Sequence, residues 1–116
     1  MTLSLAEQKA IEEKRRHTRI PFNRPITIYV NDKQNTATIT DLSLHGIGFV
    51  CYAPLNPNDR IEVHFEVPED QKLYHDFQFK AEVKHCIDLF PEKHIGVELE
   101  TPTEEYIELF DKLASA

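Results

Sequence analysis

A short basic segment, Lys14-Arg15-Arg16-His17-Thr18-Arg19, holds the side chains best suited to bind an anion. The chain of 116 residues has 13 Lys and Arg against 20 Asp and Glu, and its formal net charge is -7. Four of the 13 basic residues lie in this hexapeptide. Proteins that bind long nucleic acids are usually basic over a broad face. A single basic segment on an acidic chain instead indicates a small anion, unless the segment is only a solvated run between a helix and a strand.

A second polar segment, Asp41-Leu42-Ser43-Leu44-His45-Gly46, lies between two stretches with strand character. Asp and Ser at a strand end commonly accept hydrogen bonds from nearby backbone N–H groups, and a glycine then closes the turn. On this structural interpretation the segment is a turn and nothing more. On the functional interpretation Asp41 and Ser43 face a ligand, while Gly46 adopts a positive φ or lets the ligand approach closely.

Together the two segments resemble the signature of PilZ domains, small β-barrel receptors for the bacterial second messenger cyclic di-GMP. The resemblance lies in an R-x-x-x-R spacing (Arg15, Arg19) followed by a D-x-S-x-x-G spacing (Asp41 to Gly46), and the order of elements extends it to the C-terminus. It implies cyclic di-GMP as ligand, with no metal or other cofactor. The implied binding residues are Arg15, Arg16, Arg19, Asp41, Ser43 and Gly46, with Lys14 and His45 at the margin of the site.

The chemistry of cyclic di-GMP suits these residue types. The ligand has two phosphates and two guanines, and an Arg guanidinium bonds phosphate oxygens, bonds guanine O6 and N7, and stacks on rings. We predict that Arg15 and Arg19 each bind a guanine edge or a phosphate, and that Arg16 adds charge or stacking. Asp41 would accept hydrogen bonds from guanine N1–H and the exocyclic amine, a pair of donors that adenine does not present.

The predicted protein is a receptor and not an enzyme, and its predicted action is a ligand-ordered rearrangement. In the free protein, like charges crowd residues 14–19. Ligand phosphates neutralise this repulsion and draw the arm across the barrel beside Asp41–Gly46, which changes a surface that a partner protein reads. PilZ-like receptors take one ligand molecule or an intercalated pair, and the three basic residues before His17 favour the pair slightly.

Other functions fit the residues less well. A binder of single-stranded nucleic acid needs exposed aromatic platforms, whereas four phenylalanines fall on inward-facing positions of an acidic body (Phe49, Phe65, Phe77, Phe79). A metal enzyme needs clustered ligands, and the six histidines show no H-x-x-x-H spacing. Of these, His64, His85 and His94 have positions that could share one side of the sheet. A barrel that binds a protein and no nucleotide is the further alternative.

Length and composition predict one cytoplasmic domain. A chain of 116 residues supports a single core, and no apolar run approaches the ~20 residues of a membrane span. The N-terminus lacks the basic and apolar regions of a signal peptide. Cys51 and Cys86 match no metal or redox spacing, so we expect them to be reduced and buried.

Five stretches alternate apolar and polar residues, as half-buried strands do, and a sixth, residues 36–42, is rich in β-branched residues. The predicted strands are 26–30, 36–42, 47–51, 61–67, 77–83 and 95–99, with a bulge near residues 85–87 where the alternation slips. A short helix is predicted for residues 5–13, and Thr101-Pro102-Thr103-Glu104 predicts the start of another, with Thr101 as N-cap. The expected fold is dominated by β structure. An N-terminal helix or arm (1–13) precedes a six-stranded antiparallel PilZ-like barrel (14–116), whose one end a C-terminal helix closes.

Overall fold

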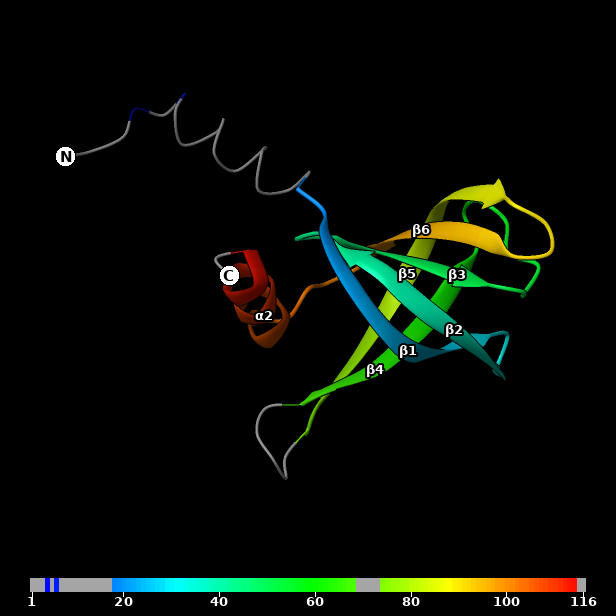
Figure 1. Cartoon of the computed structure of the whole chain (residues 1–116), viewed down its shortest axis with the longest axis horizontal. Helices are drawn as coiled ribbons and strands as arrows, with labels where there is room; N and C mark the ends of the chain where they lie inside the picture. Colours follow the sequence, from blue (N-terminus) through cyan, green and yellow to red (C-terminus); the bar gives the residue numbers. More distant parts are fainter. Residues whose placement is uncertain (1–3, 5, 7–17, 69–73, 115–116) are drawn as a thin grey trace.

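The protein is a closed antiparallel barrel with one helix across its end (Figure 1). The computed structural model describes residues 4, 6, 18–68 and 74–114. Within them the spatial order of the strands is β1-β2-β3-β6-β5-β4, and the predicted six-stranded barrel with a C-terminal helix is confirmed. The elements are β1 (Ile20–Val30), β2 (Lys33–Leu42), β3 (Gly46–Cys51), β4 (Arg60–Pro68), β5 (Tyr74–Asp88), β6 (Lys93–Leu99) and α2 (Glu104–Ala114).

The barrel core follows from the alternation of side chains along each strand, because successive residues point to opposite faces. In β4, Ile61 and Val63 are buried while the intervening Glu62 is exposed. The four phenylalanines predicted to face inward, on β3, β4 and β5, are at most 5% exposed. They belong to the core and offer no platform on which nucleic-acid bases could stack.

The strand β1 begins earlier than the sequence pattern predicts, and this brings Arg19, the last residue of the basic segment, close to the second motif. The prediction began the strand at residue 26, where the alternation of apolar and polar residues begins, and Pro21 and Pro25 before it are atypical of a strand interior. In the structure β1 extends back to Ile20, which pairs with Leu42 of β2, and a register shift between Pro21 and Arg24 accommodates the irregular stretch. Arg19 therefore lies immediately before the first residue of a strand.

A tight hairpin joins β1 to β2, although the predicted strands 26–30 and 36–42 leave the five residues 31–35 between them. Val30 pairs with Lys33, so the loop consists of Asn31 and Asp32 alone. Their φ angles are 52° and 65°, as a two-residue hairpin turn requires, and Asn and Asp tolerate this region better than most residues. The turn fixes the register of the two strands.

The barrel is closed between β1 and β4 by a short seam. Pairing runs over three residues of each strand, from Thr27 opposite His64 to Tyr29 opposite Glu62. Among the described strands, residues 20–26 of β1 therefore pair with β2 and do not pair with β4.

A register shift between Val83 and His85 bears out the predicted bulge in β5, about two residues before its expected centre. Beyond the shift, His85 pairs with Gly96 of β6. The extra residue lets Val83 remain buried while His85 is exposed.

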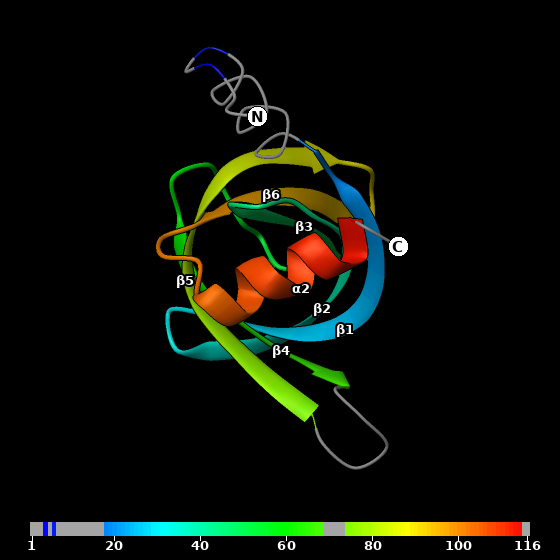
Figure 2. The ribbon, with the colours of Figure 1, turned by 90° about the vertical axis from the view of Figure 1, so that its left-hand side faces the viewer.

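The helix α2 lies across one open end of the barrel (Figure 2). It buries Tyr106 and Phe110 against the core. Its N-cap is Thr103 and not the predicted Thr101, because the Thr103 hydroxyl accepts a hydrogen bond from the Tyr106 backbone N–H at 3.2 Å. The two acidic residues of the first turn, Glu104 and Glu105, suit the positive end of the helix dipole.

The remaining predictions concern the N-terminus and the cysteines. The short helix predicted for residues 5–13 lies outside the described residues, apart from Ala6. Both cysteines are free thiols; Cys51 is buried as expected, while Cys86 is only partly buried. Burial raises the pKa of each thiol. No helix among the described residues is long and apolar enough to cross a membrane.

Candidate functional site

An arginine–aspartate pair lies where the two sequence motifs meet. Because β1 and β2 are antiparallel, with Pro21 opposite Asp41, the start of one strand lies beside the end of the other. Arg19 Nη1 donates a hydrogen bond to Asp41 Oδ1 at 2.5 Å, and Thr40 Oγ1 donates to Asp41 Oδ2 at 3.1 Å. The Asp41 carboxylate is thus held from two sides, by Arg19 and by Thr40.

All three glycines of the chain lie at this site, and each leaves room that a Cβ atom would fill. A Cβ at Gly48 would lie 2.7 Å from Asp41 Oδ1. A Cβ at Gly96 would collide with the imidazole of His85. None of the glycines has a positive φ, so their role here is to make space rather than to turn the chain.

Of the two alternatives predicted for Gly46, the positive φ is wrong, and the close approach of a ligand stays a prediction. Gly46 is needed because a Cβ there would lie 2.7 Å from the carbonyl oxygen of Val97 and 3.2 Å from Ser43 Oγ. Real Cβ atoms do not approach a backbone oxygen so closely, and Val97 is fixed in β6. The glycine therefore lets β3 pack against β6 at the end of the motif.

Four residues form a continuous row across neighbouring strands of the barrel. Asp41 on β2 pairs with Gly48 on β3, Gly48 with Gly96 on β6, and Gly96 with His85 on β5. The two glycines thus form a floor between a carboxylate at one side and an imidazole at the other. This row lies in a shallow groove of about 140 Å³, whose lining also includes Arg19, Ile87 and His94.

The Ser43–Gly46 turn has its own internal hydrogen bonds. Ser43 is 6% exposed, and its hydroxyl donates to the carbonyl oxygen of Gly46 at 3.3 Å. The carbonyl oxygen of His45 accepts a hydrogen bond from the Leu99 backbone N–H at 2.8 Å. In the structure Ser43 and His45 therefore shape the turn, although the Ser43 hydroxyl donates to a carbonyl oxygen where the structural interpretation predicts that it accepts from a backbone N–H. Contact between either residue and a ligand stays a prediction.

The structure brings together only part of the predicted binding set. Arg19, Asp41, Ser43 and Gly46 gather at one end of the β1–β2–β3 surface. The predicted contacts of Lys14, Arg15 and Arg16 lie outside the described residues, so they stay predictions.

Sequence reasoning missed Gly48, Gly96 and the role of His85 and His94 as neighbours of the site. The pattern Gly46-x-Gly48 was a usable signal, since glycines inside a strand often mark a close approach. The pairing of β3 with β6 cannot be read from the local pattern. His64 does not join the other two histidines: its ring lies 4.7 Å from that of Tyr29, at the β1–β4 seam.

Among the described residues, no group of three or more His, Cys, Asp or Glu side chains is placed to hold a metal ion.

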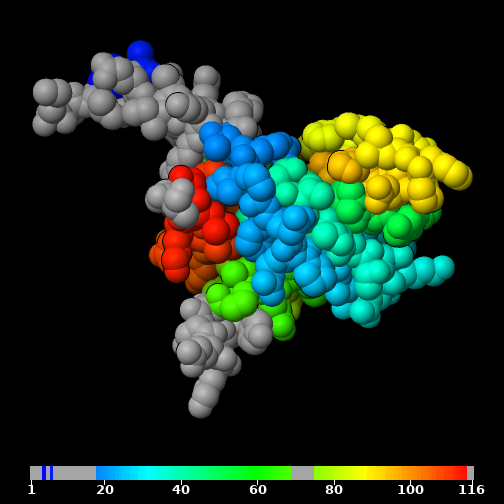
Figure 3. Space-filling view, viewed as in Figure 1, coloured from blue at the N-terminus to red at the C-terminus, as the bar shows by residue number. Residues whose placement is uncertain are grey.

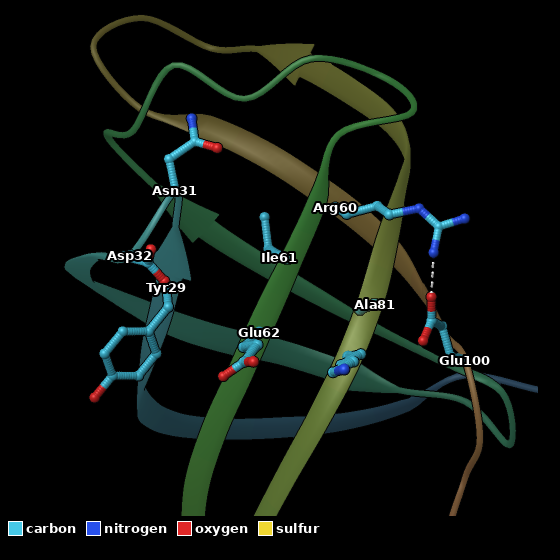
Figure 4. A pocket seen from close by; sticks show the side chains of 9 residues that line it. Tyr29, Asn31, Asp32, Arg60, Ile61, Glu62, Ala81 and Glu100 are labelled. Carbon is cyan, nitrogen blue, oxygen red and sulfur yellow. Dashed lines mark hydrogen bonds and ion pairs between the residues drawn. The ribbon is translucent and has the colours of Figure 1, made fainter.

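A larger hollow than this groove lies elsewhere, on the outer surface of β1, β4 and β5 (Figure 4). Its volume is about 610 Å³. Two cations, Arg60 and Lys80, face three acids, which are Asp32, Glu62 and Glu100. Arg60 Nη1 donates to Glu100 Oε1 at 2.5 Å. This hollow is larger than the groove beside Asp41, but its acidic side chains outnumber its basic ones. A surplus of acids disfavours an anionic ligand, so we favour the smaller groove as the candidate site.

The PilZ domain family model matches residues 13–115. The chain belongs to the PilZ domain family. The match includes both motifs and every strand, so the sequence-based recognition of the family is confirmed.

Solved structures with the same fold agree with this assignment. The PilZ domain of Escherichia coli YcgR with cyclic di-GMP has a TM-score of 0.62 at 18% identity, over 88% of this chain and 90% of that one. The Bacillus subtilis inhibitor of motility MotI/DgrA has a TM-score of 0.67 at 14% identity, over 84% of this chain. The Borreliella burgdorferi PlzA protein in complex with cyclic di-GMP has a TM-score of 0.61 at 10% identity, over 95% of this chain.

Several of these proteins are longer than the chain. It covers 46% of MotI/DgrA and 54% of PlzA. An uncharacterized protein of Aquifex aeolicus is 28% identical over 69 residues, which are 59% of this chain and 34% of that protein.

Proposed function

We propose that this PilZ domain is a receptor for cyclic di-GMP and has no enzymatic activity. The observation that carries the proposal is the Arg19–Asp41 pair, placed over a floor of two glycines where the two family motifs meet. Membership of the PilZ family and the cyclic di-GMP complexes of YcgR and PlzA support it.

Binding begins with an exchange of hydrogen-bond partners at the pair. The side chains of Arg19 and Asp41 are 46% and 31% exposed, so a ligand reaches both without unfolding the site. Guanine presents N1–H and an exocyclic amine to the Asp41 carboxylate, and Arg19 bonds a second guanine edge or a phosphate. When the ligand breaks the bond between Arg19 and Asp41, each side chain therefore gains a hydrogen-bond partner on the ligand.

The far side of the groove offers different chemistry. His85 lies over Gly96, and Ile87 and His94 line the same groove. An imidazole and an aliphatic side chain give a guanine ring a flat, partly apolar neighbour, while a histidine N–H donates to phosphate. We assign base contact to His85 and Ile87, and phosphate contact to His94.

The small volume of the groove implies that the ligand is bound partly on the open surface. Ligand pockets commonly enclose about 300–1,000 Å³, whereas this groove has about 140 Å³. It accommodates a part of cyclic di-GMP about the size of a base. In the proposal Arg15 and Arg16, with Lys14 beside them, cover the rest of the ligand, as one molecule or as an intercalated pair.

Calorimetric titration of the purified protein with cyclic di-GMP tests the proposal, with GTP and cyclic di-AMP as controls. We expect saturable binding of cyclic di-GMP alone, and the fitted ratio gives the number of ligands per chain. Absence of both heat and thermal stabilisation with cyclic di-GMP would contradict the proposal.

The Asp41→Asn variant tests the proposed recognition of guanine. The amide has an N–H₂ group where the carboxylate has a second acceptor, so guanine loses one of its two partners. We expect the preference for cyclic di-GMP over cyclic di-AMP to fall about tenfold, within the range of one base-edge contact, as measured by calorimetry. Glu100→Gln, the same change in the other ion pair, serves as control and keeps the preference. An unchanged preference in Asp41→Asn would remove Asp41 from the recognition of guanine.

Signalling to a partner protein is the finer part of the proposal. The exposed large apolar side chains of the described chain gather at the end of β3 and on the β5–β6 hairpin, namely Tyr52, Ile87, Leu89 and Phe90. This hairpin projects from the barrel away from α2 (Figures 1 and 3), and Ile87 also lines the groove. A partner docked there would contact apolar surface and bound ligand together.

Limited proteolysis by trypsin at Arg15, Arg16 and Arg19 tests the ordering of the arm by the ligand. We expect cyclic di-GMP to slow cleavage there and leave cleavage at Lys33 in the β1–β2 hairpin unchanged. Equal cleavage at the arm in both states would exclude a ligand-ordered arm, while leaving binding itself intact.

A further inference from the structure

The turn that carries the second motif is held by a residue from the far end of the chain. The Tyr106 hydroxyl on α2 donates to the carbonyl oxygen of Ser43 at 2.6 Å and lies 3.1 Å from that of Gly46. A hydroxyl has one hydrogen, so the shorter bond to Ser43 is the principal one and Gly46 shares it. This contact joins α2 directly to the candidate ligand site.

The other bonds of the turn leave the Ser43 carbonyl dependent on Tyr106. The Gly46 carbonyl also accepts the backbone N–H of Ser43 at 2.9 Å, and the His45 carbonyl accepts the N–H of Leu99 at 2.8 Å. Among the turn, loop and side-chain hydrogen bonds of the described residues, the donor to the Ser43 carbonyl is the Tyr106 hydroxyl. A buried carbonyl that loses its donor destabilises the conformation that buries it.

The environment of Tyr106 keeps its hydroxyl in place and protonated. The residue is 0% exposed, and its ring meets the ring of Phe79 edge-on, with centroids 5.2 Å apart and planes at 74°. Burial raises the pKa of Tyr106 far above its ordinary value, while the Arg19 charge lowers it and the Asp41 charge raises it by smaller amounts. The hydroxyl is therefore a permanent donor within electrostatic reach of the Arg19–Asp41 pair.

We infer that Tyr106 is a positioning residue for the cyclic di-GMP site, and that it couples occupancy of this site to α2. The inference rests on the proposed function. By holding the turn from Ser43 to Gly46, the hydroxyl fixes the path of the chain between Asp41 and Gly48, and with it the place of the carboxylate. A ligand bound at Asp41 stabilises this turn and, through it, the docking of α2. Because such coupling is reciprocal, a change that removes the hydrogen bond between Tyr106 and the turn weakens ligand binding as well, whereas a change in α2 that leaves this bond in place does not.

The Tyr106→Phe variant removes the hydroxyl and keeps the ring. We expect cyclic di-GMP to bind about three- to tenfold more weakly, as the loss of one hydrogen bond implies, measured by calorimetry. Phe110→Leu is the matched control, because Phe110 lies on the same buried face of α2 and has no hydroxyl to offer the turn. It is expected to lower Tm and leave Kd unchanged. Equal Kd values for the wild type and Tyr106→Phe would overturn the inference.

Hydrogen exchange at the α2 amides distinguishes coupling to the ligand from a general loss of stability. In the wild type, cyclic di-GMP is expected to slow exchange at the α2 amides of residues 107–113. This effect is expected to vanish in Tyr106→Phe and to persist in Phe110→Leu. Its loss in both variants would mean that α2 responds only to overall stability, which would overturn the coupling.

The failure of the inference can be told apart from the failure of the proposed function. A wild-type protein that binds no cyclic di-GMP would overturn the proposed function and the coupling to ligand. The positioning role is still tested in the ligand-free protein, where amides 43–48 are expected to exchange faster in Tyr106→Phe than in Phe110→Leu. Equal exchange at these amides would overturn the positioning role as well.

Discussion

Two arginine–carboxylate pairs on this barrel have the same length and very different surroundings. Arg19–Asp41 and Arg60–Glu100 each join their charged atoms at 2.5 Å. The Arg60 side chain is 73% exposed, and its neighbours Lys80 and Glu62 add further charges. Arg19 is 46% exposed, and its partner Asp41 lies against a glycine and accepts a second hydrogen bond from Thr40.

The comparison shows that the length of an ion pair does not identify a binding site. An exposed pair contributes about 0–1 kcal/mol to stability, because solvent screens it and two flexible side chains must be ordered. The Arg19–Asp41 pair differs because the backbone around it is shaped for it. Gly48 leaves room for the carboxylate, and the Ser43–Gly46 turn that follows is held from α2.

The largest expected contrast between the two pairs is in ligand affinity. Arg19→Ala is expected to weaken cyclic di-GMP binding about 10- to 100-fold, since one bidentate contact to guanine is worth about 1–3 kcal/mol. Arg60→Ala removes the same side chain from the other pair and is expected to leave Kd unchanged. Calorimetry on the two variants measures this difference in affinity. An equal loss of affinity in both variants would show that long-range charge, rather than local geometry, controls binding.

A smaller effect is expected when the glycine beneath Asp41 is filled. The added methyl group of Gly48→Ala lies where the Asp41 carboxylate now is, so the carboxylate must move away from its place beside Arg19. A misplaced recognition group weakens binding, and we expect a loss of about tenfold, measured by calorimetry, with the barrel intact by circular dichroism. Wild-type affinity in Gly48→Ala would show that ligand binding does not depend on the room that Gly48 leaves for the Asp41 carboxylate.

The smallest effect is expected on folding stability at the exposed pair. Arg60→Ala should change the free energy of unfolding by less than about 1 kcal/mol, as measured by urea denaturation. Added salt should reduce the difference from the wild type, since screening already weakens an exposed pair. A loss of several kcal/mol would mean that Arg60 and Glu100 form part of the structural framework, and the contrast drawn between the pairs would fail.

The barrel could be predicted from the sequence because each of its strands shows its own pattern of neighbouring residues. Alternation and one run of β-branched residues located the six strands, with the bulge expected about two residues after its place before His85, and the pattern of residues 101–104 predicted the C-terminal helix. The errors are also local. Thr101 has Pro102 after it and Glu104 three residues on, so the capping pattern favours Thr101. Thr103, which has Tyr106 at that spacing, caps the helix instead.

The site was predicted only where its residues belong to a motif. Asp41 and Arg19 could be named from spacing, and the β1–β2 hairpin brings them together. The glycine floor depends on the pairing of Gly48 with Gly96, 48 positions apart, which exists only once β3 and β6 are neighbours in the closed barrel. The hydroxyl bond of Tyr106 was missed for a related reason, because periodicity predicts that a side chain is buried but not which carbonyl it meets.

The short seam between β1 and β4 bears on how copies of the protein behave toward one another. A strand edge with free N–H and C=O groups is a template for a strand from another molecule, and long exposed edges lead to aggregation. The stretch Ile20–Ile26 of β1, which β4 does not cover in the described pairing, contains Pro21 and Pro25. Proline has no N–H and is typical of edge strands for this reason. The same residues that made the start of β1 hard to recognise in the sequence therefore make its edge a poor partner for intermolecular β-sheet.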